Sequence, residues 1–244
     1  MHMRQKWYVD SELLKWPKIN WSLQRFILDE RTHPVDELID PKLKQYQGPA
    51  LLAYNNAVFT DKDFLNLSRL GDSLKLHDGS TTGKFGRGFN SVGFCSKYSA
   101  SFTDPVQVYN WTDSPSIVSR DRLLILDPHC EWSEGGPVYD FVKNSEEVAI
   151  QNQMAAFQTV MEHLDQKLEA TVIRIPLRTQ AQALKSEISD RGTTVAEVSQ
   201  VLQSFASEFG DNGLLFMRNV EKLEIGSSGM SIEIKMADRE TLRP

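Results

Sequence analysis

The chain has 244 residues, 40% of them hydrophobic and 25% charged, with a formal net charge of -6 at pH 7. These values are typical of one large globular domain, and the acidic balance argues against nucleic acid as a main partner. No run of about 18 apolar residues that could cross a membrane is present. The two cysteines and the absence of a secretory leader predict a cytoplasmic location, with a nuclear one also open.

Residues 1–28 form an atypical aromatic segment. It contains three tryptophans and an apolar set interrupted by Pro17, which suggests short helical pieces. Two interpretations stay open, an extra helix packed on the following domain and a tail that binds a partner protein. We therefore set this segment apart and expect the folded domain over residues 29–240.

The middle of the chain predicts a mixture of strands and helices. Short runs of apolar, β-branched and aromatic residues predict strands at 50–54, 101–111 and 117–126. Thr60 and Asp63 form a capping box that begins a short helix. Helical periodicity predicts a longer helix over residues 146–168.

The C-terminal third predicts one more helix and several strands. Residues 171–178 alternate between apolar and polar, which indicates a half-buried strand, with Pro176 near a sheet edge or the strand's end. A capping box at Thr194 and Glu197 begins an amphipathic helix that ends near Gly210. Further strands are expected at 214–217, 220–225 and 230–236, with a hairpin turn at 226–229.

A glycine-rich stretch at 83–91 reads Gly-Lys-Phe-Gly-Arg-Gly-Phe-Asn-Ser. Glycine lets the backbone approach a ligand closely, and successive N–H groups at the start of a helix bind phosphate. The stretch therefore indicates a phosphate-binding loop, with a flexible surface turn as the alternative.

Two common phosphate motifs do not fit this stretch. A P-loop needs four residues between its glycines and a Ser or Thr after the lysine, whereas residues 79–85 offer three residues and then Phe85. A dinucleotide-binding fingerprint needs a third glycine where Ser91 stands.

Four motifs in order resemble the sacsin-type domains of the GHKL superfamily, whose fold is the Hsp90-like, or Bergerat, ATP-binding fold. They are Gln-Gly-Pro-Ala-Leu at 47–51, Tyr-Asn-Asn-x-x-Phe at 54–59, the glycine-rich stretch continuing through Val92, and Leu-Asp-Pro-His at 126–129. The resemblance implies an α/β (α+β) two-layer sandwich with a mixed, mainly antiparallel sheet and helices on one face. It also implies a chaperone-like protein that handles client proteins.

The resemblance implies an ATP site with adenine contacts. In the superfamily an Asp reads the adenine amino group, and the matching stretch here offers Asn55 and Asn56, which either contact the nucleotide or form an Asx-type turn. Thr171 matches a threonine that contacts adenine, although threonine is also a good strand former. His129 has no assigned chemistry, and a structural turn is the better explanation for its motif.

The resemblance also assigns the phosphate contacts to the glycine-rich stretch. Its candidate residues are Gly83, Lys84, Phe85, Gly86 and Gly88. The glycines would hold phosphate through their backbone N–H groups. Lys84 and the neighbouring Arg87 would either add positive charge or remain solvated loop cations.

One feature of the superfamily is missing. GHKL ATPases carry an early helix in which a Glu activates water and an Asn four residues later holds magnesium. Before Asp29 the chain offers Glu12, but Trp16 stands four residues later. Without a base and a metal site, phosphoryl transfer loses the groups that dominate its catalysis. We therefore expect weak binding of ATP, with or without magnesium, and little or no hydrolysis.

Two functions from different classes follow. The first is a nucleotide-binding module of a sacsin-type, chaperone-like protein. The second is a degenerate scaffold that binds a partner protein through the aromatic N-terminus or the glycine-rich stretch. A DNA-repair or topoisomerase-type domain is disfavoured by the acidic balance. The sequence does not specify an oligomeric state.

Overall fold

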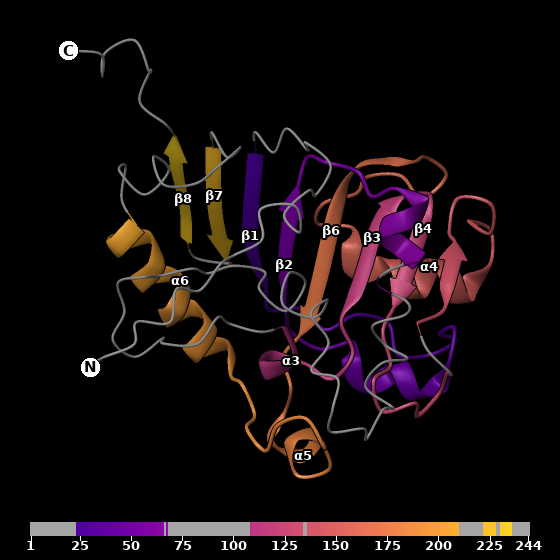
Figure 1. Cartoon of the computed structure of the whole chain (residues 1–244), viewed down its shortest axis with the longest axis horizontal. Coiled ribbons are helices and arrows are strands. Elements are labelled where there is room, and N and C mark those ends of the chain that lie inside the picture. Colours follow the sequence, from indigo (N-terminus) through magenta and orange to yellow (C-terminus); the bar gives the residue numbers. More distant parts are fainter. Residues whose placement is uncertain are drawn as a thin grey trace, which may run out of the picture.

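The computed structural model describes residues 23–65, 67, 108–133, 136–209, 222–227 and 230–235. Within these residues, eight strands form one sheet in the order β5-β4-β3-β6-β2-β1-β7-β8 (Figure 1). The strands are β1 (Leu23–Asp29), β2 (Ala50–Asn55), β3 (Ser116–Arg120), β4 (Arg122–Ile125), β5 (Val138–Asp140), β6 (Leu168–Pro176), β7 (Lys222–Ser227) and β8 (Met230–Lys235). Neighbouring strands are antiparallel except β1 and β7, which run parallel.

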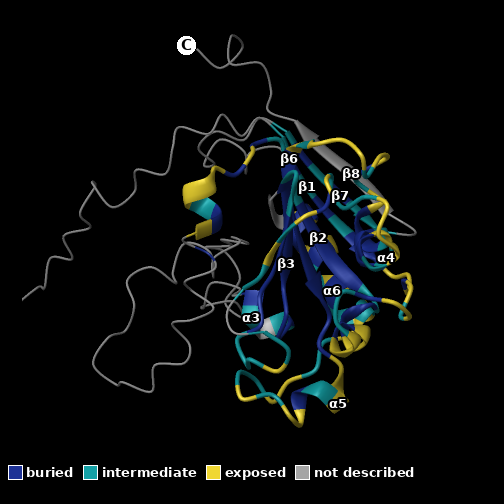
Figure 2. Ribbon diagram, turned by 90° about the vertical axis from the view of Figure 1, so that its right-hand side faces the viewer, coloured by how far each residue is buried: buried dark blue, intermediate teal, exposed yellow. Residues whose placement is uncertain are grey.

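The central strands bury side chains on both faces of the sheet. Leu51 and Ala53 of β2 belong to one hydrophobic cluster, whereas Leu52 and Tyr54 belong to the other. This is the alternation that a strand imposes on successive side chains. Figure 2 shows the buried residues concentrated along these strands. The sheet therefore separates two hydrophobic layers.

The first layer lies under α6 (Val195–Phe209), the longest helix among the described residues, and we call this side of the sheet the α6 face. Three buried residues of α6, Val198, Leu202 and Phe205, pack against the strands. The short helix α3 (Val108–Trp111) and a helical segment at 61–65 and 67 cover the same face. The other side, the α4 face, carries α4 (Val148–Met154) and the 3-10 helices η2 (Pro41–Tyr46) and η3 (Ala155–Phe157).

The predicted class of an α/β (α+β) sandwich is confirmed, since the sheet is mixed, mainly antiparallel and packed with helices, whereas its Hsp90-like type stays a prediction. The short helices on the α4 face go beyond the prediction of helices on one face. They are present because β2, β3 and β6 are buried on both sides and both apolar surfaces need cover. No helix among the described residues is long and apolar enough to span a bilayer.

Two segments have a different secondary structure from the one predicted. Residues 23–28 were expected to be helical, but they form most of β1, which pairs with both β2 and β7. The predicted domain boundary at residue 29 thus cuts through a strand of the sheet. Residues 108–111, expected to be the end of a strand, form helix α3.

Two more predictions were wrong in extent or environment. The helix expected over 146–168 ends at Met154, continues as η3 and then as turns, and β6 begins at Leu168. Strand β6 lies between β3 and β2 and is not half-buried, because Arg174 on its polar side is 2% exposed. A short helix, α5 (Gln180–Ala183), follows β6 behind a capping box at Thr179.

Candidate functional site

Four polar side chains form a row across one end of the sheet on the α6 face. Asn55 of β2 is paired with Gln24 of β1 on one side and with Thr171 of β6 on the other. Thr171 is paired in turn with Ser119 of β3. The next residues on this face along the four strands are apolar, namely Phe26, Ala53, Ile173 and Ile117. We call Gln24, Asn55, Thr171 and Ser119 the polar row.

The two residues of the polar row on β6 and β3 are completely buried. Thr171 and Ser119 are both 0% exposed. The Thr171 hydroxyl donates to the Ala57 carbonyl at 2.8 Å, and the Ser119 hydroxyl donates to the Ala170 carbonyl at 2.8 Å. The two hydroxyl oxygens lie 2.9 Å apart. Both hydroxyl groups are therefore satisfied within the protein.

Asn55 joins the row to the turn that leaves β2. Its side-chain Oδ1 accepts from the backbone N–H of Ala57 at 3.0 Å, which is an Asx-type turn. Thr171 binds the carbonyl of the same residue, so both the N–H and the carbonyl of Ala57 are bonded to side chains of the polar row. The Asx-turn interpretation of Asn55 is thus confirmed as a structural role.

Asn56 binds the backbone of β1. Its Oδ1 accepts from the backbone N–H of Leu23 at 3.2 Å, and its own backbone N–H donates to the Leu23 carbonyl at 3.4 Å. These bonds fix the first residue of β1. Asn56 therefore holds the backbone directly next to Gln24.

The chain after this turn brings two aromatic rings and a helix beside the polar row. The backbone N–H of Phe59 donates to the Ser119 hydroxyl at 2.9 Å. The rings of Phe59 and Phe64 meet edge to face, with centroids 5.6 Å apart. The predicted capping box is present, because Thr60 N donates to the Asp63 carboxylate at 2.8 Å and Asp63 N to the Thr60 hydroxyl at 3.3 Å.

Of the sequence-predicted site residues, the structure brings Asn55 and Thr171 together as direct neighbours. Asn56 follows in the same turn. The glycine-rich stretch, with Gly83, Lys84, Phe85, Gly86 and Gly88, lies outside the described residues. Sequence reasoning missed Gln24 and Ser119. The signal for Ser119 was a small polar residue two positions after Ile117, hence on the same face of the strand.

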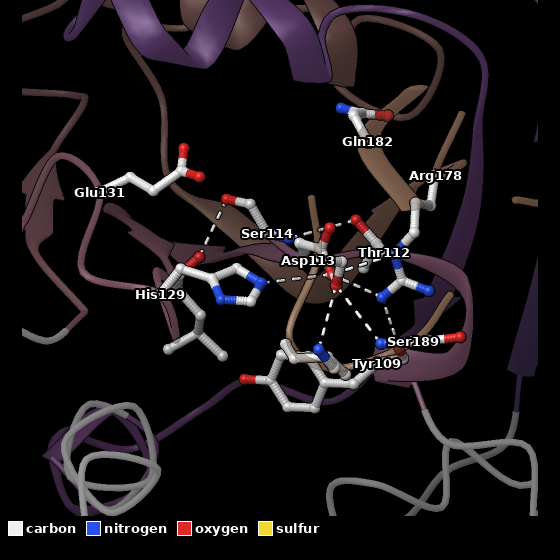
Figure 3. A network of polar contacts seen from close by, with 12 residues as sticks. Tyr109, Thr112, Asp113, Ser114, His129, Glu131, Arg178, Gln182 and Ser189 are labelled. Carbon is white, nitrogen blue, oxygen red and sulfur yellow. Dashed lines mark hydrogen bonds and ion pairs between the residues drawn. The ribbon is translucent and has the colours of Figure 1, made fainter. Parts of the chain in front are cut away.

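A second polar cluster on the chain surrounds Asp113 (Figure 3). Arg178, 1% exposed, donates to Asp113 Oδ1 through Nε at 3.0 Å and through one terminal nitrogen at 2.6 Å. Ser186 donates to the same oxygen at 2.8 Å. The Arg178 side chain also donates to the Tyr109 carbonyl at 2.6 Å. This cluster ties α3 to the segment that follows β6.

The Leu-Asp-Pro-His motif forms a turn against this cluster. Asp127 accepts from the backbone N–H groups of Trp132 at 2.8 Å and Ser133 at 3.0 Å. His129 Nε2 lies 3.6 Å from Asp113 Oδ1 (Figure 3). A structural role of the motif, which the sequence favoured, agrees with these contacts.

On the α4 face, the buried side chain of Arg174 binds the backbone just before β2. Arg174 donates to the carbonyls of Tyr46 at 2.7 Å and Gly48 at 2.8 Å. Burial lowers the pKa of Arg174 to about 10, although the nearby Asp29 carboxylate opposes this shift. The guanidinium is charged at neutral pH and acts as a structural clamp.

Comparisons with known proteins place the chain in a family. A family model described as the Sacsin domain matches residues 21–235. The chain belongs to the sacsin-domain family. It is also 32% identical over 207 residues to human sacsin. The match covers 82% of this chain but 4% of the human protein, so the chain corresponds to a small part of its relative.

Proposed function

We propose that this sacsin-type domain is a nucleotide-binding module of the Hsp90-like type, in which ATP binds weakly with its base against the polar row. The observation that carries the proposal is the pairing of Asn55 with Thr171 on the helix-covered α6 face. These residues are far apart in the sequence, and the family resemblance assigned both of them to adenine. Phosphate contacts are assigned to Gly83, Gly86 and Gly88 through their backbone N–H groups.

The proposed binding is weak for two reasons. Thr171 is completely buried and its hydroxyl is already bonded to Ala57, so it shapes the site without an open group for a direct contact. Asn55 carries no charge, and neutral hydrogen bonds are about half as strong as charge-assisted ones.

We expect the domain to hydrolyse little or no ATP by itself. The segment before β1 contains no Glu with an Asn four residues later that would supply a water-activating base and a magnesium ligand. The proposed role is therefore nucleotide-dependent control of a chaperone-like protein that acts on client proteins in the cytoplasm.

A second candidate is a protein-interaction scaffold that no longer binds nucleotide. The observation in its favour is that, among the described residues, the side-chain hydrogen bonds of Asn55 and Thr171 all serve the 55–57 turn or a neighbouring strand. In that case the polar row would be a structural feature, and the domain would act through protein contacts.

Thermal unfolding separates the two candidates. The melting temperature is measured with and without millimolar Mg·ATP, Mg·ADP or ATP with EDTA, on the wild-type chain and on Gly86→Ala/Gly88→Ala. A ligand at about 100 times its Kd adds roughly 2.7 kcal/mol of stability. A shift in the wild type that the double variant loses supports nucleotide binding. No shift at any concentration supports the scaffold.

A further inference from the structure

We propose that Gln24 is a specificity-determining residue whose side-chain oxygen accepts a hydrogen bond from the exocyclic amino group of adenine. This inference rests on the proposed function and extends it to a strand that the family motifs do not include. Gln24 and Asn55 then form an adjacent pair of amides that reads the hydrogen-bonding edge of the base.

The position of Gln24 supports this role. It is the direct cross-strand neighbour of Asn55, and both side chains lie on the α6 face. Side chains paired in this way have Cβ atoms about 4.5–5.5 Å apart. From that separation the two side-chain amides can converge on neighbouring polar atoms of one base.

The Gln24 side chain is nearly buried and has no protein partner among the described residues. The residue is 9% exposed, and its side chain has no hydrogen bond to any residue that the structure describes. A nearly buried polar group without a protein partner is suited to meet a ligand, because an unpaired polar group is costly to bury.

Asn55 presents a defined donor beside it. The Ala57 N–H can only be received by an oxygen, so it fixes Oδ1 on the turn side and leaves Nδ2 for a ligand. Nδ2 has no hydrogen bond to a described residue. A donor at Asn55 next to an acceptor at Gln24 complements adenine, whose ring N1 accepts and whose amino group donates.

Asn56 keeps this pair in register. Its side chain receives the Leu23 N–H, and its backbone N–H donates to the Leu23 carbonyl. The residue before Gln24 is therefore tied to the residue after Asn55. These bonds hold the backbones of Gln24 and Asn55 in place relative to each other.

The test compares three probes by NMR titration of the whole chain. They are ATP, purine riboside triphosphate, which lacks the amino group, and inorganic tripolyphosphate, which lacks the base. We expect the wild type to bind ATP about tenfold more tightly than purine riboside triphosphate, the factor that one well-made hydrogen bond supplies. In Gln24→Met, which keeps the side-chain volume, this preference should disappear while the affinity for tripolyphosphate is unchanged.

The variant Gln24→Glu keeps an acceptor oxygen and should retain the preference for ATP. An unchanged preference for ATP in Gln24→Met would overturn the inference and leave the proposed nucleotide binding intact. An equal loss of tripolyphosphate and ATP binding would also overturn it, because it would show a structural role for Gln24. If none of the three probes binds the wild type, the proposed function fails, and the inference fails with it.

Discussion

At the scale of single residues, the hydroxyl of Thr171 joins the strands of the site to the turn that follows β2. It donates to the Ala57 carbonyl and lies 2.9 Å from the Ser119 hydroxyl, in a region without access to solvent. Removing this hydroxyl leaves the buried Ala57 carbonyl without the donor that it has in the folded protein, whereas Ser119 keeps its bonds to Ala170 and Phe59.

We predict that Thr171→Val lowers the free energy of unfolding by about 1–3 kcal/mol, because the shape is kept while the Ala57 carbonyl loses its donor. Thr171→Ser is the control, since it keeps the hydroxyl. Urea unfolding of the three proteins measures the difference. Equal stability of the valine and threonine forms would contradict the role of this hydroxyl.

The ion pair of Arg178 and Asp113 is buried, so removal of one partner should be severe. We predict that Arg178→Met costs about 3–5 kcal/mol, because the Asp113 charge is left uncompensated in the interior. The control is the exposed pair Arg191–Glu197, at 3.2 Å, where Arg191→Gln should cost at most about 1 kcal/mol. Chemical denaturation of both variants measures the two losses of stability. Equal losses would contradict the prediction that the buried pair contributes more than the exposed one.

The Asp29 carboxyl is a source of acid sensitivity. Burial alone raises its pKa, but hydrogen bonds from Arg31 and from His33, at 3.1 Å, outweigh burial and hold the pKa well below its usual range. Because the folded pKa lies below the unfolded pKa of about 3.9, Asp29 stabilises the fold above that pH. This contribution is lost progressively as the pH falls through and below it.

We therefore predict that Asp29→Asn is less stable than the wild type at neutral pH and that the gap narrows as the pH falls from 5 to below about 3. The measurement is the free energy of unfolding of both proteins as a function of pH. A gap that stays constant over this interval would show that the Asp29 charge is not the origin of the acid sensitivity.

At the scale of elements, the sequence predicted correctly those features that depend on local contacts, such as the capping box of a helix. The capping box of α6 is present, with Thr194 N donating to the Glu197 carboxylate at 2.8 Å and Glu197 N to the Thr194 hydroxyl at 3.2 Å. We predict that Thr194→Ala destabilises the protein by about 1 kcal/mol through the lost cap. Gln200→Ala, on the exposed surface of the same helix, should be nearly neutral. Thermal unfolding of both variants tests this, and equal stability would refute it.

Elements that depend on distant partners could not be read from the sequence. Residues 23–28 lie between an aromatic segment and a polar loop, and they are a strand because β2 and β7 pair with both of their edges. The alternation of β6 suggested a half-buried strand. Arg174 is nevertheless buried, because the carbonyls of Tyr46 and Gly48 accept hydrogen bonds from its two terminal nitrogens. In both cases tertiary contacts outweigh the local pattern.

At the scale of the whole molecule, the candidate site is a product of strand register. The family motifs identified Asn55 and Thr171, and the sheet then made them neighbours. Gln24 and Ser119 entered the row only through the pairing of β1 with β2 and of β3 with β6. No local motif encodes such pairings, because a shift of one residue would turn each side chain to the other face.

The central claim is that a nucleotide lies on the α6 face against the polar row. The most direct measurement is photolabelling of the chain with 8-azido-ATP, followed by mass spectrometry of the peptides. We predict saturable labelling that unlabelled ATP prevents, located in peptides that contain residues 24, 55–59 or 171. Labelling that ATP does not prevent, or that maps to the helices of the α4 face, would contradict the claim.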